Sequence, residues 1–138
     1  MRHREEHSLV EDYGQHYRDS SAEIVLSIER AVLGSDFGSS GYTTAAQAQQ
    51  LIEYLPLGPD KRALDLGAGC GWPGLHVALA TGCALVATDL PLNGLIRAAD
   101  RAADEGISGR VLTVKCSARD LPFRDASFDA IVHSDFLC

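Results

Sequence analysis

Apolar residues recur at helical spacing in the first stretch of the chain that has a clear pattern. The stretch begins at Ser21, and its apolar positions are Ile24, Val25, Ile28 and Val32. Residues three and four apart lie on one face of a helix, so this spacing predicts an amphipathic helix. Ser20 or Ser21 is expected to cap its start and Gly34 to end it.

A second helix is predicted a few residues later. Residues 36–42 combine Asp, Gly and Ser in a pattern typical of a turn, and Thr43 or Thr44 is placed to cap the helix that follows. This helix is expected to end before residue 58. The first dozen residues of the chain are charged and aperiodic, and no element is predicted there. Two helices are therefore expected before any strand.

The pattern changes after Pro59, where short apolar runs alternate with helical stretches. The runs typical of strands are residues 62–66, 84–89, 110–114 and 128–133. The stretches typical of helices are residues 72–80 and 92–103, and the apolar stripe of the second is Leu92, Leu95, Ile96, Ala99 and Ala103. This alternation predicts an α/β domain with parallel strands, right-handed crossovers and a sheet buried on both faces.

Length and charge narrow the range of functions. A chain of 138 residues is long enough for one domain with a buried core. The formal net charge of −7, without a Lys or Arg cluster, argues against nucleic acid or an anionic membrane as a partner. No run approaches the roughly 18 apolar residues that cross a bilayer, and the start is unlike a signal peptide, so a cytoplasmic protein is expected. The 4 cysteines lack paired spacing, which predicts reduced, packed side chains and no metal site.

Candidate chemistry concentrates at the end of the first predicted strand. The residues concerned are Asp65, Gly67, Ala68, Gly69 and Gly71. Glycine allows a positive φ and lets a ligand approach bare backbone, and the helix that follows offers unpaired N–H groups at its start. The segment therefore predicts a ligand-binding loop. The alternative is a tight strand-to-helix turn without a ligand.

An acid stands at the end of the second predicted strand. Because the carboxyl ends of parallel strands meet at one edge of a sheet, Asp89 is expected to face the same crevice as the glycine loop. In doubly wound sheets such an acid accepts hydrogen bonds from ribose hydroxyls, and Leu90 is placed to pack on a flat base. A turn or a helix cap is the alternative role for Asp89.

Two classes of cofactor compete for this geometry. Residues 69–74 satisfy the pattern GxGxxG, and Asp89 follows about twenty residues later, as in a dinucleotide-binding fingerprint. An NAD-binding oxidoreductase is therefore an alternative. Asp65 argues against it, because a carboxylate so close to the loop would repel a pyrophosphate and attract a cationic group such as the ammonium of a methionine moiety.

Four motifs in order resemble those of class I S-adenosyl-L-methionine-dependent methyltransferases. They are the DxGxGxG loop that starts at Asp65, the acid Asp89, the pair Arg119-Asp120 before residues 121–123, and the run 127–132. The resemblance implies a Rossmann-like fold and the cofactor S-adenosyl-L-methionine, with S-adenosyl-L-homocysteine as product. It also implies a methyltransferase that acts on a small molecule.

The same resemblance implies which residues bind the cofactor. They are Asp65, Gly67, Ala68, Gly69, Gly71, Asp89, Leu90 and Asp120. By the resemblance, Asp65 and the Gly67 backbone lie near the methionine amine, and the later glycines lie under the sugar and the methionine. Asp89 is expected at the ribose and Asp120 near the adenine amine.

The N-terminal segment is similar to that of a narrower group, the phosphoethanolamine N-methyltransferases and related small-molecule methyltransferases. Residues 17–19, 28–34 and 37–41 carry this similarity, although Ile28 stands where the group often has an aromatic residue. In those enzymes the segment folds over the cofactor as a lid, with a tyrosine near the reacting centre and a Ser-Gly pair at the methionine end. The matching positions are Tyr17, Ser40 and Gly41.

Methyl transfer depends mainly on positioning and on the exclusion of water. A general base helps only where the acceptor atom carries a proton, and the candidates at the end of the fourth strand are His133, Ser134 and Asp135. Asp135 matches an acid of the phosphoethanolamine N-methyltransferases and is preferred to His133 as the general base. Asp135, His133 and Tyr17 form the predicted catalytic set. The alternatives are a packed strand histidine at position 133 and a helix cap at position 135.

The implied organisation is a helical lid of two helices in residues 1–57 and a Rossmann-like domain in residues 58–138. The family normally continues with a helix, a fifth strand and an antiparallel pair that carry much of the acceptor pocket. A sheet that stops after the fourth strand has an uncovered edge. Several alternatives remain open. The chain is a fragment, a truncated chain, or a protein that a second copy completes as a homodimer through that edge. A catalytically inactive cofactor-binding module is a further alternative.

Overall fold

The computed structural model describes residues 2–38 and 41–134. Its helices are α1 (Arg2–Asp19), α2 (Glu23–Leu33), α3 (Ala45–Tyr54), α4 (Gly74–Thr81) and α5 (Leu92–Asp104), with a short 3-10 helix at Ser108–Arg110. Its strands are β1 (Arg62–Leu66), β2 (Ala84–Asp89), β3 (Val111–Lys115) and β4 (Ala130–His133). The elements predicted after residue 59 are therefore confirmed, with shifts of one or two residues at their ends.

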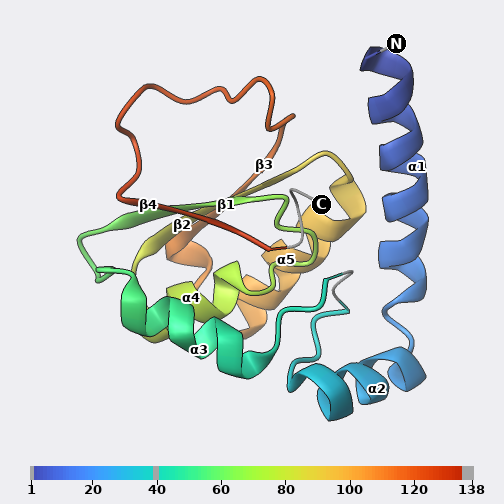
Figure 1. Ribbon diagram of the computed structural model, residues 1–138, viewed down its shortest axis with the longest axis horizontal. Helices are drawn as coiled ribbons and strands as arrows, with labels where there is room; N and C mark the ends of the chain where they lie inside the picture. Colours follow the sequence, from blue (N-terminus) through green and yellow to red (C-terminus); the bar gives the residue numbers. More distant parts are fainter. Residues whose placement is uncertain (1, 39–40, 135–138) are drawn as a thin grey trace.

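The strands form one parallel sheet in the order β3-β2-β1-β4 (Figure 1). The chain runs outward from β1 through β2 to β3, and β4 then pairs with the other side of β1. The strand order reverses at this point, and in doubly wound sheets a crevice forms there, outside the carboxyl ends of the strands. The predicted Rossmann-like α/β class with parallel strands is confirmed.

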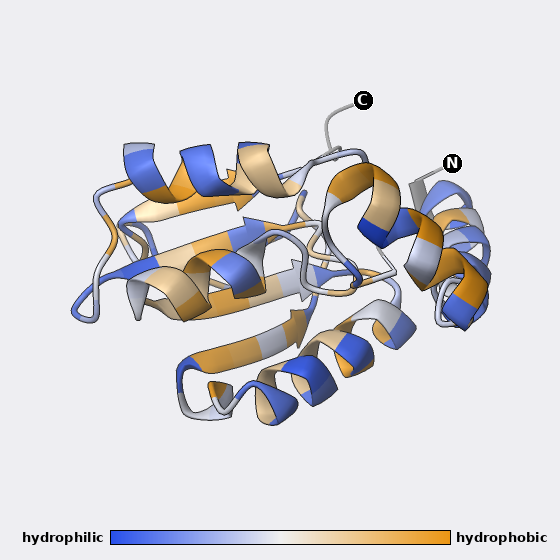
Figure 2. Cartoon of the chain, turned by 90° about the horizontal axis from the view of Figure 1, so that it is seen from below, coloured by the Kyte–Doolittle hydropathy of each residue, from blue (hydrophilic) through white to orange (hydrophobic). Residues whose placement is uncertain are grey.

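One face of the sheet carries the hydrophobic core. Figure 2 shows helices α3, α4 and α5 in front of this face. The core contains Ala63 and Leu85 from the strands, Leu75 from α4 and Ala98 from α5. Small side chains on the strands and on α5 allow the helices to approach the sheet closely, which gives the dense packing that interiors require.

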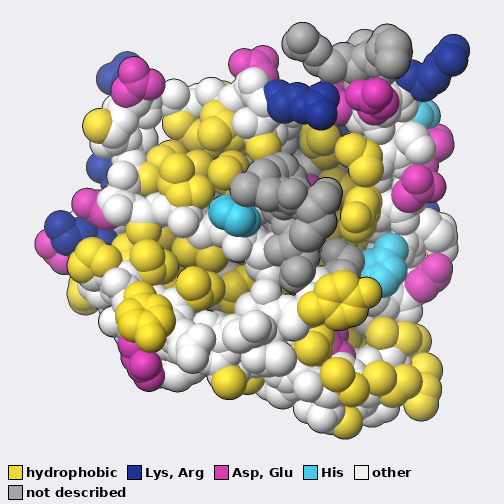
Figure 3. All heavy atoms as spheres, in the orientation of Figure 1, with side chains coloured by type: hydrophobic (Ala, Val, Ile, Leu, Met, Phe, Trp, Pro, Cys, Tyr) yellow, Lys and Arg dark blue, Asp and Glu magenta, His cyan; other side chains and the backbone are white. Residues whose placement is uncertain are grey.

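The other face of the sheet is only partly covered in the described residues. The register places Leu64, Val86, Leu112 and Ile131 in one row across it. Leu112 is 58% exposed and Ile131 is 57% exposed, and hydrophobic side chains are visible on the surface in Figure 3. The loop between β3 and β4 crosses above this face (Figure 1). The expectation of a sheet buried on both faces is therefore wrong for the described residues, because no described helix packs on this side.

The buried side of α5 also differs from the predicted stripe. The buried residues of α5 are Gly94, Leu95, Ala98 and Ala102. Leu92 and Ile96 are each 50% exposed, and Ala99 and Ala103 are exposed as well. Of the predicted stripe only Leu95 is buried. The prediction failed because small residues, which score weakly as apolar, form the side that touches the sheet.

Helix α1 was not predicted. Its sequence is polar over most of its length, and its buried positions are Gly14, Tyr17 and, just past its end, Ser20. These positions recur three residues apart, so they share one side of the helix, and that side packs against α5. The number of helices before the first strand is three instead of two, because a stripe of small and polar residues gives no hydrophobic signal.

Helix α2 forms where the apolar pattern predicts it and ends at Gly34, as expected. Its start is different, because Ala22 is the N-cap residue and no side chain caps it, so the assignment to Ser20 or Ser21 is wrong. The apolar stripe faces solvent: Ile24 is 68% exposed and Val32 is 70% exposed. The side chain that α2 buries is the carboxylate of Glu29.

Helix α3 confirms the second predicted helix in detail. Thr44 is its N-cap, and a capping box joins the side chain and backbone of Thr44 to Gln47.

Cys70, Cys83 and Cys116 are free cysteines, as expected, while Cys138 lies outside the described residues. Within residues 2–38 and 41–134, no helix combines the length and apolar character that spanning a bilayer requires.

Candidate cofactor site

The glycine loop leaves β1 and leads into α4 at the carboxyl edge of the sheet. Gly69 has a φ of +52°, a conformation that side chains with a branched Cβ rarely adopt. A Cβ at this position would lie 2.7 Å from the Tyr17 hydroxyl oxygen. Glycine is therefore required at position 69 both for the turn and for the close approach of Tyr17.

Asp89 joins three other residues at the end of β2. Its Oδ2 accepts a hydrogen bond from the Gly69 N–H at 2.8 Å, and its Oδ1 accepts one from the Leu90 N–H at 2.8 Å. The Tyr17 hydroxyl is a third donor to this carboxylate. Burial raises the pKa of Asp89, and the three hydrogen bonds oppose the rise. The predicted meeting of Asp89 with the glycine loop is observed.

A cavity of about 410 Å³ opens beside this cluster. Its residues from α1 are Glu5, Glu6, Leu9, Tyr13 and Tyr17. Its residues from the ends of the strands are Gly67, Thr88, Asp89, Leu90, Pro91, Cys116, Ser117, Ala118, Arg119 and Ser134. Three carboxylates and one guanidinium line it, so the cavity favours a cationic ligand over an anionic one.

Helix α1 bridges the cavity and is the part of the N-terminal segment that lines it. At one end Tyr17 contacts Asp89, and at the other the Ser117 Oγ donates to Glu6 Oε1 at 3.0 Å. The sequence predicted a lid of two helices within residues 1–57, but the N-terminal helix that lines this cavity is the unpredicted α1. The position of α3 against α4, on the far side of the glycine loop, excludes it from this cavity.

Asp65 lies beneath the loop and is 1% exposed. Its Oδ2 is buried and has no hydrogen-bond partner among the described residues. A Cβ at Gly74 would overlap this carboxylate, so Gly74 provides the space for it at the start of α4. Burial raises the pKa of Asp65 to about 8, the Asp89 carboxylate adds to the rise, and the Gly74 N–H opposes it. A buried carboxyl group with one oxygen left without a hydrogen bond is a strained arrangement that a cationic group would relieve.

The other predicted cofactor residues are spread around this centre. Gly67 and Leu90 line the cavity. Ala68 and Gly71 are buried, and Gly71 packs against Leu75 and Ala98, where a Cβ would not fit. The exposed Asp120 directly follows the cavity residues of the loop after β3, and the partly exposed Gly41 precedes α3. Ser40 lies outside the described residues.

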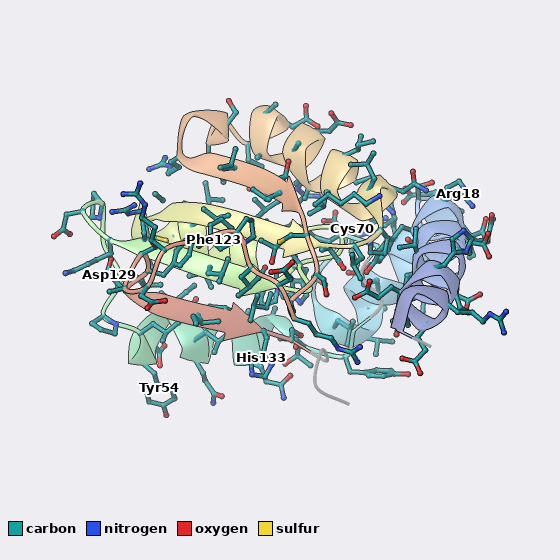
Figure 4. All side chains as sticks on the ribbon, turned by 90° about the horizontal axis from the view of Figure 1, so that it is seen from above. Arg18, Tyr54, Cys70, Phe123, Asp129 and His133 are labelled. Carbon is teal, nitrogen blue, oxygen red and sulfur yellow. The ribbon has the colours of Figure 1, made fainter. Side chains whose placement is uncertain are left out.

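Two of the predicted catalytic residues, His133 and Tyr17, lie on different elements, β4 and α1. Figure 4 shows His133 at the carboxyl end of β4, opposite Asp129 at the start of this strand. His133 is exposed, so the alternative of a packed strand histidine is wrong. Ser134, the next residue, lines the cavity and contacts the Thr43 hydroxyl. Tyr17 lies at the Asp89 end of the cavity, and Asp135 lies outside the described residues.

Several cavity residues were missed by the sequence analysis. Glu5, Glu6 and Tyr13 come from the helix that the hydrophobic pattern does not reveal. Leu9, Tyr13 and Tyr17 recur every four residues, with the two tyrosine ring centroids 6.2 Å from each other, and this spacing is a helical signal in the segment. Cys116 and Ser117 were missed because the end of β3 carries no motif.

The glycine loop, the acid at the end of β2 and the reversal of strand order define a Rossmann-like domain with a ligand crevice at its carboxyl edge. Residues 63–138, more than half of the chain, match the family model described as a methyltransferase domain. The chain belongs to this family.

One curated protein and two solved structures are similar to this chain. Methyltransferase GfsG from Streptomyces halstedii is 36% identical over 83 residues, which are 60% of this chain and 30% of that protein. Geranyl diphosphate C-methyltransferase from Streptomyces coelicolor A3(2), solved with Mg²⁺, geranyl diphosphate and S-adenosyl-L-homocysteine, has a TM-score of 0.60 at 26% identity; the match covers 64% of this chain and 34% of that chain. The [4+2]-cyclase SpnF has a TM-score of 0.59 at 31% identity, with 67% and 35% covered. The chain thus spans about a third of the length of these relatives.

Proposed function

We propose that this chain is the cofactor-binding part of an S-adenosyl-L-methionine-dependent methyltransferase that acts on a small molecule. The observation that carries the proposal is the cluster of Asp89, Gly69 and Tyr17 at the rim of the 410 Å³ cavity. Relatives with a bound S-adenosyl-L-homocysteine and a small acceptor support the same assignment.

The residues present fit this cofactor in three ways. The cavity volume lies in the range of small-molecule sites, about 300–1,000 Å³. The acidic lining from Glu5, Glu6 and Asp89 suits a ligand that carries a sulfonium and an ammonium group. The unpartnered Oδ2 of Asp65 supplies a further acceptor for positive charge close to the loop.

Asp89 is the residue that we assign to the ribose. A carboxylate has about four lone-pair sites, and Gly69, Leu90 and Tyr17 use three of them. One site is left for a ribose hydroxyl, and the Tyr17 oxygen is itself an acceptor for a second one. Leu90 and Pro91 supply the apolar wall for the base. Asp120 is assigned to its amine, next to the cavity residues 116–119.

When bound, S-adenosyl-L-methionine supplies a methyl group that its sulfonium already activates. The work left to the protein is to orient the cofactor and the acceptor and to exclude water. In this proposal α1 covers the cofactor, and residues 1–57 form the lid of the Rossmann-like domain 58–138. His133, Ser134 and Asp135 remain the candidates for proton transfer at the end of β4, and Tyr17 is assigned to orienting the cofactor.

A second candidate function has one observation in its favour. The neighbour SpnF is a [4+2]-cyclase, so this scaffold also occurs in a protein named for a different reaction. A protein that binds the cofactor without transferring its methyl group is therefore the competing reading. Activity decides between the two, and cofactor binding alone does not.

The first experiment is a thermal-shift titration of the purified chain with S-adenosyl-L-homocysteine and with NAD. A ligand that binds the folded state stabilises it by about 2.7 kcal/mol at a hundred times its Kd. We expect a rise in Tm with S-adenosyl-L-homocysteine and none with NAD. A rise with NAD alone would contradict the proposal and restore the dinucleotide alternative.

The second experiment measures radiolabelled methyl transfer from S-adenosyl-L-methionine to a panel of small amines, phenols and carboxylates. Transfer to any of them supports the methyltransferase. Size-exclusion chromatography of the same sample shows whether any transfer belongs to the monomer or to the dimer. Binding without transfer is expected of both candidates, because the described residues do not form the acceptor half.

A further inference from the structure

We propose that Arg97 of α5 is a positioning residue of the cofactor site, which holds the end of α1 so that Tyr17 closes on Asp89. This inference rests on the proposed function. Arg97 belongs to no motif of the sequence and does not line the cavity. It acts on the site through the backbone of Tyr17.

The guanidinium of Arg97 ties two separate segments to α5. Its Nη1 donates to the Tyr17 carbonyl oxygen at 2.6 Å and to the Ser20 Oγ at 2.9 Å. Its Nη2 donates to the Phe37 carbonyl oxygen at 3.0 Å. A guanidinium presents its donors in a rigid planar fork, so these contacts fix the distance between the end of α1 and the turn at Phe37.

The turn at Phe37 is itself held firmly, so it can serve as an anchor. The buried carboxylate of Glu29 accepts from the Ser35 hydroxyl at 2.7 Å and from the Gly38 N–H at 2.7 Å. The Ser20 hydroxyl donates to the Gly38 carbonyl oxygen at 2.8 Å. Hydrogen bonds to a buried charged group are among the stronger ones in proteins. Arg97 therefore connects α1 to a fixed point and not to a loose loop.

Tyr17 is thereby held at both ends. Its carbonyl is bound by Arg97 on α5, and its hydroxyl is bound by Asp89 at the end of β2. Its side chain lies between two glycines, because a Cβ at Gly69 would lie 2.7 Å from its hydroxyl oxygen and a Cβ at Gly94 would lie 2.9 Å from its ring. A small displacement of the α1 end would move the hydroxyl off the carboxylate. Misplacements of about 1 Å already cost large factors in binding and reaction rates.

The neighbouring Arg101 provides a matched control. It lies four residues further along α5 and also reaches the turn, with Nη1 3.0 Å from Asp36 Oδ1 and its guanidinium 4.3 Å from the centre of the Phe37 ring. Among the described residues its hydrogen bonds go to Asp36 and Glu105, and none goes to α1, unlike those of Arg97. The two variants Arg97→Ala and Arg101→Ala thus remove equal groups from one helix and differ in the connection to Tyr17.

The experiment measures the Kd of S-adenosyl-L-homocysteine by calorimetry for the wild type, Arg97→Ala, Arg97→Lys and Arg101→Ala. We expect Arg97→Ala to weaken binding about 5- to 20-fold, Arg97→Lys to recover part of the loss, and Arg101→Ala to stay within about twofold while its Tm falls. In the background of Tyr17→Phe the loss from Arg97→Ala should shrink to less than about twofold, because the two residues act in one chain of contacts.

Equal losses in both backgrounds, or an equal loss in Arg101→Ala, would overturn the proposal. A wild type that fails to bind S-adenosyl-L-homocysteine would refute the proposed function instead. If the wild type does not bind S-adenosyl-L-homocysteine, or if a variant has a lowered Tm, a second measurement tests the positioning role. It is the amide hydrogen exchange rate of residues 13–20 in the absence of ligand. Faster exchange in Arg97→Ala than in Arg101→Ala is expected, and equal exchange would overturn the positioning role independently of any ligand.

Discussion

The ends of β2 and β4 lie at the same edge of one sheet, but they are built differently. At β2, the Asp89 carboxylate receives three donors from three elements and is more than half buried by them. At the end of β4, His133 is exposed. The hydroxyl of Ser134 contacts that of Thr43, a residue that does not belong to the glycine loop. The β2 end is therefore preorganised in the absence of any ligand, and the β4 end is open.

The open end adjoins a second hollow of about 360 Å³ between α3 and β4. Its lining includes His133, Ser134, Gln47 and Tyr54, and Tyr54 is 79% exposed. Ser134 lines both hollows, so the two are neighbours. On the proposed function, the described residues carry a formed cofactor half and do not form the acceptor half. Substitutions at the β2 end should affect cofactor affinity, and those at the β4 end should not.

The largest effect is expected from Gly69→Val. A branched side chain is strained at a φ of +52° and would collide with the Tyr17 hydroxyl, so binding of S-adenosyl-L-homocysteine should be abolished. Gly82→Val is the control, because Gly82 also has a positive φ of +77° but ends α4 far from the loop. Calorimetry should show normal affinity for the control and none for Gly69→Val. Normal affinity in Gly69→Val would remove the loop from the site.

Asp65→Asn should change how stability depends on pH. The folded pKa of about 8 lies above the ordinary carboxyl value of 3.8, so the protonated carboxyl stabilises the fold below pH 4, and this contribution is lost as the pH rises to about 8. The wild type should lose up to about 1.4 kcal/mol per pH unit in that window from this group, and Asp65→Asn should not. Urea unfolding between pH 5 and 8 measures the difference. Parallel curves for the two proteins would show that Asp65 is already ionised.

Asp89→Ala should weaken S-adenosyl-L-homocysteine by about 1.5–3 kcal/mol, the scale of hydrogen bonds to a charged group. Asp129→Ala is the matched control at the other end of β4, where the carboxylate accepts from the Arg62 N–H at 2.8 Å and binds no part of the loop. The control should lower Tm and leave affinity unchanged. If Asp89→Ala also lowers only Tm, Asp89 is a structural cap and its ribose role is wrong.

The smallest effect is expected from His133→Ala. Because His133 is exposed at the open end, its loss should change the affinity for S-adenosyl-L-homocysteine by less than about twofold. The same calorimetric titration checks this result. A loss as large as that of Asp89→Ala would show that the cofactor reaches β4, and the contrast between the two ends would fail.

The sequence predicted those parts of the site that depend on local chemistry. A charged residue at the end of a buried strand followed by alternating glycines has few other uses, and Asp65 and Gly69 do lie at the strand-to-helix turn. Asp89 was placed by topology alone, since the ends of parallel strands meet at one edge. The predicted catalytic set stays a prediction, since Asp135 lies outside the described residues and Tyr17 and His133 come from separate elements.

Helices α1 and α2 show where the hydrophobic pattern fails. The pattern located α2 but suggested a buried stripe, and Ile24 and Val32 are exposed while Glu29 is buried. The pattern missed α1, whose buried side consists of Gly14, Tyr17 and Ser20. The spacing of apolar residues indicates which side of a helix can be buried. Whether that side is buried depends on the element that packs against it, and this element comes from elsewhere in the chain.

By itself, the sequence determined the order of strands and helices after residue 59, the glycine loop and the acid at the end of β2, because each depends on the conformational preferences of a few adjacent residues. Tertiary structure alone decided that α1 lines the cavity, that Arg97 reaches the Tyr17 carbonyl at a separation of 80 residues in the chain, and that one face of the sheet keeps Leu112 and Ile131 exposed. These features depend on which surfaces meet, and contacts between small or polar residues far apart in the chain leave no periodic signal in it.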